Sequence, residues 1–262
     1  MTLDLPSERA VVLFSGGFDS TLVLADLVSS ASDTDTIYAV SIQHNLTGVQ
    51  KLRREYESQL LILRELRKRF PKIKIEHEVI TVESNWISGD TSSSRGLAQP
   101  ILWLCNLIPL LQQGDVIYVG YNKDDQAIIH LDNITNLLKA ACVIQENKKL
   151  SVEYPLKYRP KVDVLRRILT DYPYLFDVCT SCESMLYAGE SVCGSCTPCQ
   201  HLKEALLLIS LDANEQAEKA KEMLYSKFGL QITVTNINTD DSKISAETES
   251  ICSSTETGEV SS

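Results

Sequence analysis

The sequence predicts an α/β fold, in which a parallel sheet is flanked by helices in a Rossmann-like arrangement, followed by a helical lobe. Two observations predict it. Over the first 150 residues, short apolar runs typical of buried strands alternate with stretches of helical periodicity. From residue 151 to about 237, helical patterns surround a cluster of cysteines. We therefore expect an α/β domain at 1–150, a helical lobe at 151–237 and a flexible acidic tail at 238–262.

The elements of the expected α/β domain follow from their apolar spacing. The first strand is Ala10–Phe14, whose sequence AVVLF is long enough for one buried strand. Ser15-Gly16-Gly17 interrupts it, and helical spacing resumes over Asp19–Leu27. The other expected elements are the strands Thr36–Ile42, Lys74–Val82 and Asp115–Gly120 and the helices Lys51–Phe70 and Pro100–Leu111. Because these strands alternate with helices, they form βαβ units and hence a parallel sheet.

The helical lobe is expected to consist of two helices with the cysteines between them. The helical patterns cover Lys161–Leu169 and His201–Phe228. Ile232–Ile237 has the composition of a final strand. From Asn238 onward the chain is rich in Ser, Thr, Asp and Glu, which predicts a segment without a core of its own.

Composition and charge exclude several classes of protein. With 44% hydrophobic residues in 262, the chain has enough apolar side chains for a core and is not a disordered chain. Its longest apolar runs are much shorter than the roughly 20 residues that span a bilayer, so we expect no membrane partner. No basic, hydrophobic leader opens the sequence, so we expect a cytoplasmic protein. The formal net charge of -10 argues against a general nucleic-acid binder.

A phosphate-binding loop is expected where the first strand meets the first helix. The sequence there is Ser15-Gly16-Gly17-Phe18-Asp19-Ser20. The first N–H groups of a helix have no intrahelical partner and attract anions, and glycines allow a close approach of the backbone. Ser15 and Ser20 add hydroxyl donors, and Asp19 is placed to organise Mg²⁺ on a nucleotide. The alternative is an ordinary strand-to-helix turn, in which Ser and Gly are common.

A metal site is expected at the cysteine cluster. Cys193, Cys196 and Cys199 follow one another at intervals of three, a spacing that brings thiolates together on one tetrahedral Zn²⁺. Cys182 is the favoured fourth ligand, and Cys179 and His201 are the alternatives. Four sulfur ligands leave no open position for water, so the zinc is expected to be structural. Isolated buried cysteines or a redox CxxC pair are the competing interpretations.

Taken together, the two motifs resemble a known family. The SGG-x-DS string resembles the pyrophosphate loop of the ATP-dependent adenine nucleotide α-hydrolase superfamily. That loop, combined with Thr180-Ser181-Cys182 and the later CGxCxxC, resembles the 7-cyano-7-deazaguanine synthase (QueC) family over roughly residues 9–210. The resemblance implies that Cys182, Cys193, Cys196 and Cys199 bind zinc. It also implies a nucleotide loop of Ser15, Gly16, Gly17, Asp19 and Ser20, with Asp19 as the catalytic candidate, whereas Cys179 has no counterpart.

The sequence departs from that family where the family binds its substrate. Gln99 stands in the place of a family arginine, although Arg95 is nearby. The family's acidic elements after the fourth strand are replaced by a segment that contains Lys123, Asp124 and Asp125. These five residues are therefore our candidates for an altered substrate pocket, and they favour a divergent branch of the family.

The resemblance implies an ATP-dependent ligase, with Mg²⁺ on the ATP. Such an enzyme activates the carboxylate of 7-carboxy-7-deazaguanine as an acyl adenylate, and a nitrogen nucleophile then forms an amide, which the family proper dehydrates to a nitrile. One alternative is a QueC-like antiphage-defence enzyme that joins the deazaguanine to an amine of a partner protein. Another is an inactive nucleotide-binding adaptor. The sequence leaves open the acceptor, the role of Cys179 and the oligomeric state, for which a homodimer is one option.

Overall fold

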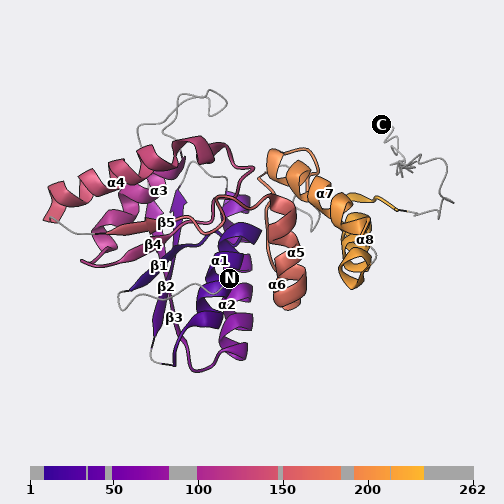
Figure 1. Cartoon of the computed structure of the whole chain (residues 1–262), viewed down its shortest axis with the longest axis horizontal. Helices are drawn as coiled ribbons and strands as arrows, with labels where there is room; N and C mark the ends of the chain where they lie inside the picture. The colour runs from indigo at the N-terminus through magenta and orange to yellow at the C-terminus, as the bar shows by residue number, and fades with distance from the viewer. Residues whose placement is uncertain are drawn as a thin grey trace, which may run out of the picture.

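The computed structural model describes residues 9–33, 35–44, 49–82, 99–146, 150–183, 192–212 and 214–232. Its centre is a five-stranded sheet in the order β3-β2-β1-β4-β5, in which all the paired strands are parallel (Figure 1). The strands are β1 (Ala10–Leu13), β2 (Thr36–His44), β3 (Lys74–Val82), β4 (Val116–Tyr118) and β5 (Ser151–Glu153). The predicted parallel α/β fold is thereby confirmed.

Helices cover both faces of this sheet, because the side chains of each strand alternate between two cores. On β1, Ala10 and Val12 pack in one core with α1 (Phe18–Ser30), α2 (Val49–Arg69) and α5 (Lys161–Asp171). Val11 and Leu13 pack in the other core with α3 (Gln99–Leu107) and α4 (Leu131–Glu146). The nearly continuous apolar sequence of β1 reflects its burial on both faces.

The strand order creates a switch point between β1 and β4. After β1 the chain adds β2 and β3 on one side, and it then returns to add β4 and β5 on the other side. The segments that leave β1 and β4 at their carboxyl ends therefore diverge. In open parallel sheets, ligands bind in the crevice that forms at such a point.

The C-terminal helices extend the molecule to one side of the sheet (Figure 1). They are α6 (Pro173–Phe176), α7 (Thr197–Ser210) and α8 (Glu215–Phe228), which follow α5. The prediction of a single helix over His201–Phe228 is wrong, because the structure has two helices, α7 and α8, in this region. The side chain of Asn214 accepts a hydrogen bond from the Ala217 N–H, and this N-cap starts a new helix.

Several elements are absent from the sequence-based assignment, among them the short helix α6. The helix α4, with the 3₁₀ turn η2 (Gln126–His130) before it, occupies a stretch to which we assigned no element. The short strand β5 pairs with β4, so the sheet continues beyond residue 150, where we expected it to end. A further 3₁₀ turn, η1 (Ile108–Leu110), completes the helix predicted to reach Leu111. Ile232 is not in a strand, and 233–237 and the tail lie outside the described residues.

One helical stretch differs from our expectation that no segment is apolar enough for a membrane. Gln126–Ile144 is long and apolar enough to cross a bilayer by length and composition alone, with a mean hydropathy of 1.3. Within it, Ile134, Leu138 and Cys142 are buried in the core against the sheet. This stretch therefore packs as a helix of the α/β fold, with apolar side chains such as Val143 exposed on its outer side.

Candidate functional site

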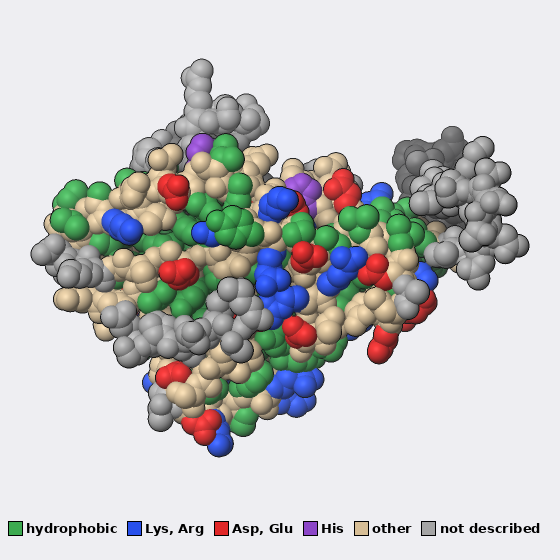
Figure 2. Space-filling model, in the orientation of Figure 1, with side chains coloured by type: hydrophobic (Ala, Val, Ile, Leu, Met, Phe, Trp, Pro, Cys, Tyr) green, Lys and Arg blue, Asp and Glu red, His purple; other side chains and the backbone are tan. Residues whose placement is uncertain are grey.

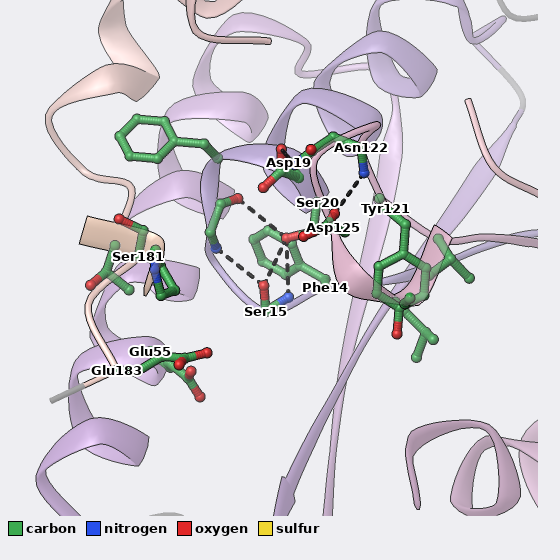
Figure 3. A pocket seen from close by; sticks show the side chains of 18 of the residues that line it. Phe14, Ser15, Asp19, Ser20, Glu55, Tyr121, Asn122, Asp125, Ser181 and Glu183 are labelled. Atoms are coloured by element: carbon green, nitrogen blue, oxygen red, sulfur yellow. Dashed lines mark hydrogen bonds between the residues drawn. The ribbon is translucent and has the colours of Figure 1, made fainter. Parts of the chain in front are cut away.

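A cavity of about 490 Å³ lies at the switch point, beside the carboxyl ends of β1, β2 and β4. Ser15 and Gly17 of the loop after β1 and the first residues of α1 line it. Segments 119–127 and 180–183, together with Lys161 and His201, close its other sides. Residues far apart in sequence thus meet around one space, and Figure 3 shows the side chains of 18 of them.

The loop after β1 has a conformation that requires glycine at one position. Gly16 has φ +82°, in the left-handed region that side chains disfavour. A Cβ at Gly16 would also lie 3.2 Å from the Glu55 carbonyl oxygen and 3.2 Å from the Ser58 hydroxyl. The Gly16 carbonyl accepts hydrogen bonds from Ser58 Oγ at 3.1 Å and from the Thr180 N–H at 3.1 Å. The loop is therefore held closely between α2 and the segment before the cysteine cluster.

The two serines of the predicted loop bond to each other and to the loop backbone. Ser15 Oγ and Ser20 Oγ are 3.0 Å apart, and the Ser15 N–H donates to Ser20 Oγ at 3.2 Å (Figure 3). The Gly17 N–H donates to Ser15 Oγ at 3.3 Å. Gly17 is the N-cap of α1 and has no side chain to cap it. The positive end of this helix therefore faces the cavity, an arrangement that suits an anion.

A second glycine, Gly120, allows the segment after β4 to approach α1. A Cβ at this position would lie 2.9 Å from the Ser20 nitrogen and 2.9 Å from the Asp19 carbonyl carbon. Both of these are backbone atoms, which cannot rotate away. Gly120 therefore fixes how closely the β4 side of the crevice packs on the first turn of α1.

Asp19 is held by two residues from the opposite side of the crevice. Asn122 Nδ2 donates to Asp19 Oδ1 at 3.0 Å, and Lys161 Nζ donates to Asp19 Oδ2. The Asp19 side chain is 21% exposed and that of Lys161 is 10% exposed, so the ion pair borders the cavity. A cation and a carboxylate are thus placed together at the positive end of α1.

The predicted pocket residues Asp124 and Asp125 lie beside this pair. Asp125 Oδ2 accepts from the Asn122 N–H at 2.7 Å, and Asp124 Oδ2 accepts from the Lys161 N–H at 2.7 Å. Burial raises the pKa of Asp125, and the charge of Asp19 raises it further. Both carboxylates therefore organise the backbone that presents Asn122 and Lys161 to Asp19.

Of the other predicted pocket residues, only Lys123 has a described side chain. Lys123 is exposed and does not line the cavity. Gln99 is the first residue of α3, but its side chain lies outside the described part of the structure. Arg95 also lies outside the described residues.

One part of the cavity is apolar and the opposite part is polar. Leu13, Val40 and Ile42 at the ends of β1 and β2 line the apolar part, together with Trp103 of α3 and Tyr121 after β4. The polar part is lined by α2 and by the segment at 180–183. Such a division suits a ligand with a flat apolar ring and a polar remainder.

The predicted metal ligands come together at the start of α7. The sulfur atoms of Cys182, Cys193, Cys196 and Cys199 all lie within 4.8 Å of one another. Burial disfavours the Cys193 thiolate, but donors from Cys196 and Ser195 outweigh it and lower the pKa of this thiol to about 5. The alternative ligands Cys179 and His201 are not part of this group. Burial raises the pKa of the Cys179 thiol to about 12, as expected for an inert core cysteine.

The geometry of the four sulfurs fits a single tetrahedral ion. With Zn–S bonds of about 2.3 Å, a tetrahedral zinc holds its sulfur ligands about 3.8 Å apart. The distance between Cys193 Sγ and Cys199 Sγ is 3.8 Å. A 4Fe–4S cluster takes one thiolate on each iron and holds its four thiolates farther apart. The group of four cysteines can therefore hold a metal ion, and its spacing favours one ion.

A short segment connects the cysteine group to the predicted phosphate loop. Cys182 lines the cavity, and the Glu183 N–H donates to Cys196 Sγ at 3.4 Å. Two residues before Cys182, the Thr180 N–H donates to the Gly16 carbonyl. A short piece of chain thus joins the loop to the metal ligands.

Several residues of the site were not identified from the sequence. Lys161 and Gly120 are the most important, followed by Glu55 and Gln59 of α2. Gly120 had a positional signal, because it closely follows β4 at the carboxyl edge of the sheet, whereas Lys161 lies well beyond the end of β5 and had none. Glu55 and Gln59 share one face of a charged helix, and nothing in the periodicity separates that face from a solvated one.

No family model and no curated protein matches the sequence. Among solved structures, the chain is similar to NMN synthetase from Francisella tularensis, with 15% identity, a TM-score of 0.43 and 82% of each chain covered. It is also similar to the U34-tRNA thiolase NcsA from Methanococcus maripaludis, solved with its 4Fe-4S cluster. There the identity is 14% and the TM-score 0.46, over 84% of this chain and 73% of that one.

A third similar structure is the glutamine-dependent NAD+ synthetase from Acinetobacter baumannii in complex with ADP. The identity is 14% and the TM-score 0.38, and the match covers 83% of this chain and 40% of that chain. These likenesses do not assign a family or a reaction to the chain.

Proposed function

We propose that this protein is an ATP-dependent adenylating synthetase of the adenine nucleotide α-hydrolase type. The observation that carries the proposal is the Lys161–Asp19 pair at the uncapped start of α1, directly beside the loop at Gly16 and Gly17. The helix end and Lys161 supply positive potential for phosphates. Asp19 is the carboxylate that would hold Mg²⁺ on ATP, and this ion would offset the charge of the pyrophosphate.

The division of the cavity supports an orientation for ATP. In our proposal the adenine ring packs on the apolar part formed by Leu13, Val40 and Ile42, and the phosphates follow the loop toward α1. A carboxylate oxygen of the second substrate then attacks the α-phosphorus. The bond between the α-phosphorus and the bridging oxygen breaks, and pyrophosphate leaves with the electron pair. The product is an acyl adenylate.

The second half of the proposed reaction forms a C–N bond. A nitrogen nucleophile attacks the acyl carbon, AMP leaves with the electron pair of the broken C–O bond, and the nitrogen loses a proton. The site contributes by positioning the reactants and by placing positive charge where negative charge develops. The zinc proposed at the four cysteines has no part in these steps and stabilises the lobe that closes the cavity.

We further propose the QueC type of this chemistry, with 7-carboxy-7-deazaguanine as the carboxylate substrate and an amide or a nitrile as product. The support is the combination of the loop with the four converging cysteines, which is the layout that the sequence shares with that family. We also propose a cytoplasmic localisation. The proposed site consists of the loop at Ser15–Ser20, the cysteine group and the Asp124–Asp125 segment.

A second proposed function is that of a QueC-like antiphage-defence enzyme that uses an amine of a partner protein. The altered segment at Lys123–Asp125 favours it, since Asp124 and Asp125 here hold the loop backbone. An inactive adaptor is less well supported, because a protein without catalysis has no need for the paired Asp19 and Lys161.

The proposal is tested by the release of pyrophosphate from ATP with and without 7-carboxy-7-deazaguanine, followed by mass spectrometry of the products. We expect the release of pyrophosphate to depend on the carboxylate substrate. The main product should be an adenylate or an amide, with little free nitrile. The measurement is repeated with ammonia and with candidate partner proteins. Pyrophosphate release that is independent of the carboxylate would contradict the assignment to the QueC type. Efficient nitrile formation without a partner protein would contradict the assignment to a divergent branch.

A further inference from the structure

The polar part of the cavity is built from one stripe of α2. Lys51, Glu55 and Gln59 follow at intervals of four residues, so they lie on the same face of the helix, and all three line the cavity. Lys51 Nζ lies 3.7 Å from Glu55 Oε1. The side chain of Glu55 is 24% exposed and that of Lys51 16%. This stripe is therefore a wall of the cavity and not a solvated helix face.

A second acidic side chain faces this stripe from another part of the chain. Figure 3 shows the side chains of Glu55 and Glu183 next to each other, Glu55 on α2 and Glu183 on the segment before the cysteine group. Burial raises the pKa of Glu55, Lys51 lowers it in part, and the charge of Glu183 raises it again. The two carboxylates carry more negative charge than the single ammonium of Lys51 neutralises.

Two more acceptors in this region have no partner in the described structure. Gln59 is 2% exposed, and its Nε2 donates to the Ser15 carbonyl at 3.2 Å, but its Oε1 has no hydrogen-bond partner. The hydroxyl of Ser181, which also lines the cavity, has no partner either. A buried polar atom without a partner costs about 1–3 kcal/mol, so such atoms in a cavity wall indicate a ligand.

The chemistry of this wall excludes phosphate as its ligand. The carboxylates of Glu55 and Glu183 repel anions, and the Gln59 oxygen can only accept hydrogen bonds. The wall therefore presents three acceptor groups, together with the adaptable hydroxyl of Ser181. Its complement is a ligand edge that carries several adjacent N–H donors and no negative charge.

We propose that Glu55, Gln59 and Glu183 form a subsite that binds a row of adjacent N–H donors on the second substrate. A 2-amino-4-oxopyrimidine edge, as in guanine-type bases, and a guanidinium group both carry this row. The inference rests on the proposed function, because it assigns the end of the substrate that points away from ATP. The substrate then has opposite ends, with the N–H edge at α2 and the reacting carboxylate at the phosphate loop.

This arrangement explains how a carboxylate substrate is oriented in an acidic pocket. If the ligand turned around, its carboxylate would face Glu55 and Glu183, and its N–H edge would face Lys161. The carboxylate would then meet like charges, and the N–H donors would face the ammonium of Lys161, which has no acceptor to offer. The repulsion selects the orientation in which the carboxylate reaches the α-phosphorus.

The test compares Glu55→Gln and Glu183→Gln with Glu57→Gln as the matched control. Glu57 lies on the same helix, is 55% exposed and pairs with Arg53. Binding is measured by calorimetry for ATP, for 7-carboxy-7-deazaguanine, for its analogue without the 2-amino group, and for agmatine as the guanidinium probe. We expect the two variants to bind the deazaguanine about tenfold or more weakly. Both variants should bind ATP with the affinity of the wild type. The Glu57→Gln variant should bind every probe with the affinity of the wild type.

The probes distinguish the sources of the N–H row and separate this inference from the proposed function. Loss of affinity for the analogue without the amino group assigns a base edge, and tight binding of agmatine assigns a guanidinium. Equal binding by Glu55→Gln, Glu183→Gln and Glu57→Gln overturns the subsite. The subsite is also overturned if the wild type binds Mg²⁺ in the absence of ATP and both Glu→Gln variants lose this binding, because the carboxylates would then be metal ligands. Failure of the wild type to bind ATP sinks the proposed function, while the binding of the other probes still decides the subsite.

Discussion

Lys161 at the start of α5 donates a hydrogen bond to Asp19 in the first turn of α1, although the two residues are 142 positions apart. The pair crosses the switch point of the sheet and brings a cation to the positive end of α1. An ammonium placed there, instead of in solvent, adds to the potential of the helix end. The pair is therefore the feature from which the proposed nucleotide chemistry is best tested.

Lys161→Met is expected to lower ATP turnover by about 10²–10³-fold, the usual cost of removing one preorganised donor from a charged transition state. The variant also leaves Asp19 without its cation. Pyrophosphate release is measured beside circular dichroism, which should show an intact fold. Lys157→Met is the control, because Lys157 is exposed and does not line the cavity. Equal turnover in the two variants would show that Lys161 only supports the fold.

Gly120→Ala is expected to weaken nucleotide binding by moving the first turn of α1. The added Cβ would lie 2.9 Å from the Ser20 nitrogen, and overpacking of this kind costs about 1–3 kcal/mol. Gly229→Ala is a matched control with the same chemical change. Gly229 has φ +65° at the end of α8 and no atom within 4 Å of the added Cβ, so its substitution strains the backbone far from the cavity.

Both glycine variants should unfold at lower temperature than the wild type, but only Gly120→Ala should lose affinity for ATP. Thermal unfolding and equilibrium binding are measured on the same preparations. An ATP affinity of Gly120→Ala equal to that of Gly229→Ala would show that the contact between β4 and α1 does not shape the site.

Metal removal is expected to destabilise the helical lobe and to loosen the phosphate loop. The protein should contain one zinc per chain, and a chelator or Cys193→Ser should remove it. Because Thr180 and Cys182 join the loop to the metal ligands, the Gly16 and Gly17 region should then exchange its amide hydrogens faster. Cys105→Ser is the control, since Cys105 is exposed and outside the group.

Metal analysis is the measurement that decides this prediction. An absence of bound metal in the wild type, or unchanged stability after its removal, would contradict it. Iron with sulfide, seen as a visible absorption band, would replace zinc by a cluster and would contradict the spacing argument from Cys193 and Cys199.

Much of the fold could be predicted because buried strands and helices each require a characteristic spacing of apolar residues. The apolar run before Ser15 and the alternation of strands and helices predicted β1 and the parallel sheet. The helix α4 also had a signal, since Leu131, Ile134, Leu138 and Cys142 recur at helical intervals. β5 had almost none, because a strand of three residues gains its structure only by pairing with β4.

The candidate site could be predicted where its residues are close together in the sequence. The predicted phosphate loop and the three cysteines at 193–199 are each contiguous, so their spacing alone indicated them as candidates. Lys161 and Glu183 reach the cavity only through tertiary folding, which the sequence pattern does not record. The division of the predicted helix at Asn214 shows the same limit, because a cap that interrupts an apolar pattern is a single residue.

The last prediction concerns Asp26, which ties α1 to α5. Arg167 donates to both carboxylate oxygens of Asp26 at 2.7 Å, and Tyr172 Oη donates at 3.0 Å. The Asp26 side chain is 6% exposed. Arg167→Ala leaves this buried carboxylate without its cation, which typically costs about 3–5 kcal/mol of stability.

The cost of Arg167→Ala should depend on pH. Burial already raises the pKa of Asp26 in the folded protein, against the opposing effect of Arg167. For a carboxyl with a raised folded pKa, the protonated form favours folding below the unfolded pKa, and that contribution is lost as the pH rises through the folded pKa. Without Arg167 the folded pKa rises further. The variant should therefore be most destabilised at neutral pH and should recover, relative to wild type, as the pH falls.

The matched comparison for this pair is Asp26→Asn combined with Arg167→Ala. The neutral amide needs no cation, so the double variant should be more stable than Arg167→Ala at neutral pH and should lack its pH dependence. Urea unfolding of wild type, both single variants and the double variant at two pH values gives the coupling. Additive free energies at neutral pH would show that the two residues do not act as a pair, and that α1 and α5 are held together by their apolar contacts alone.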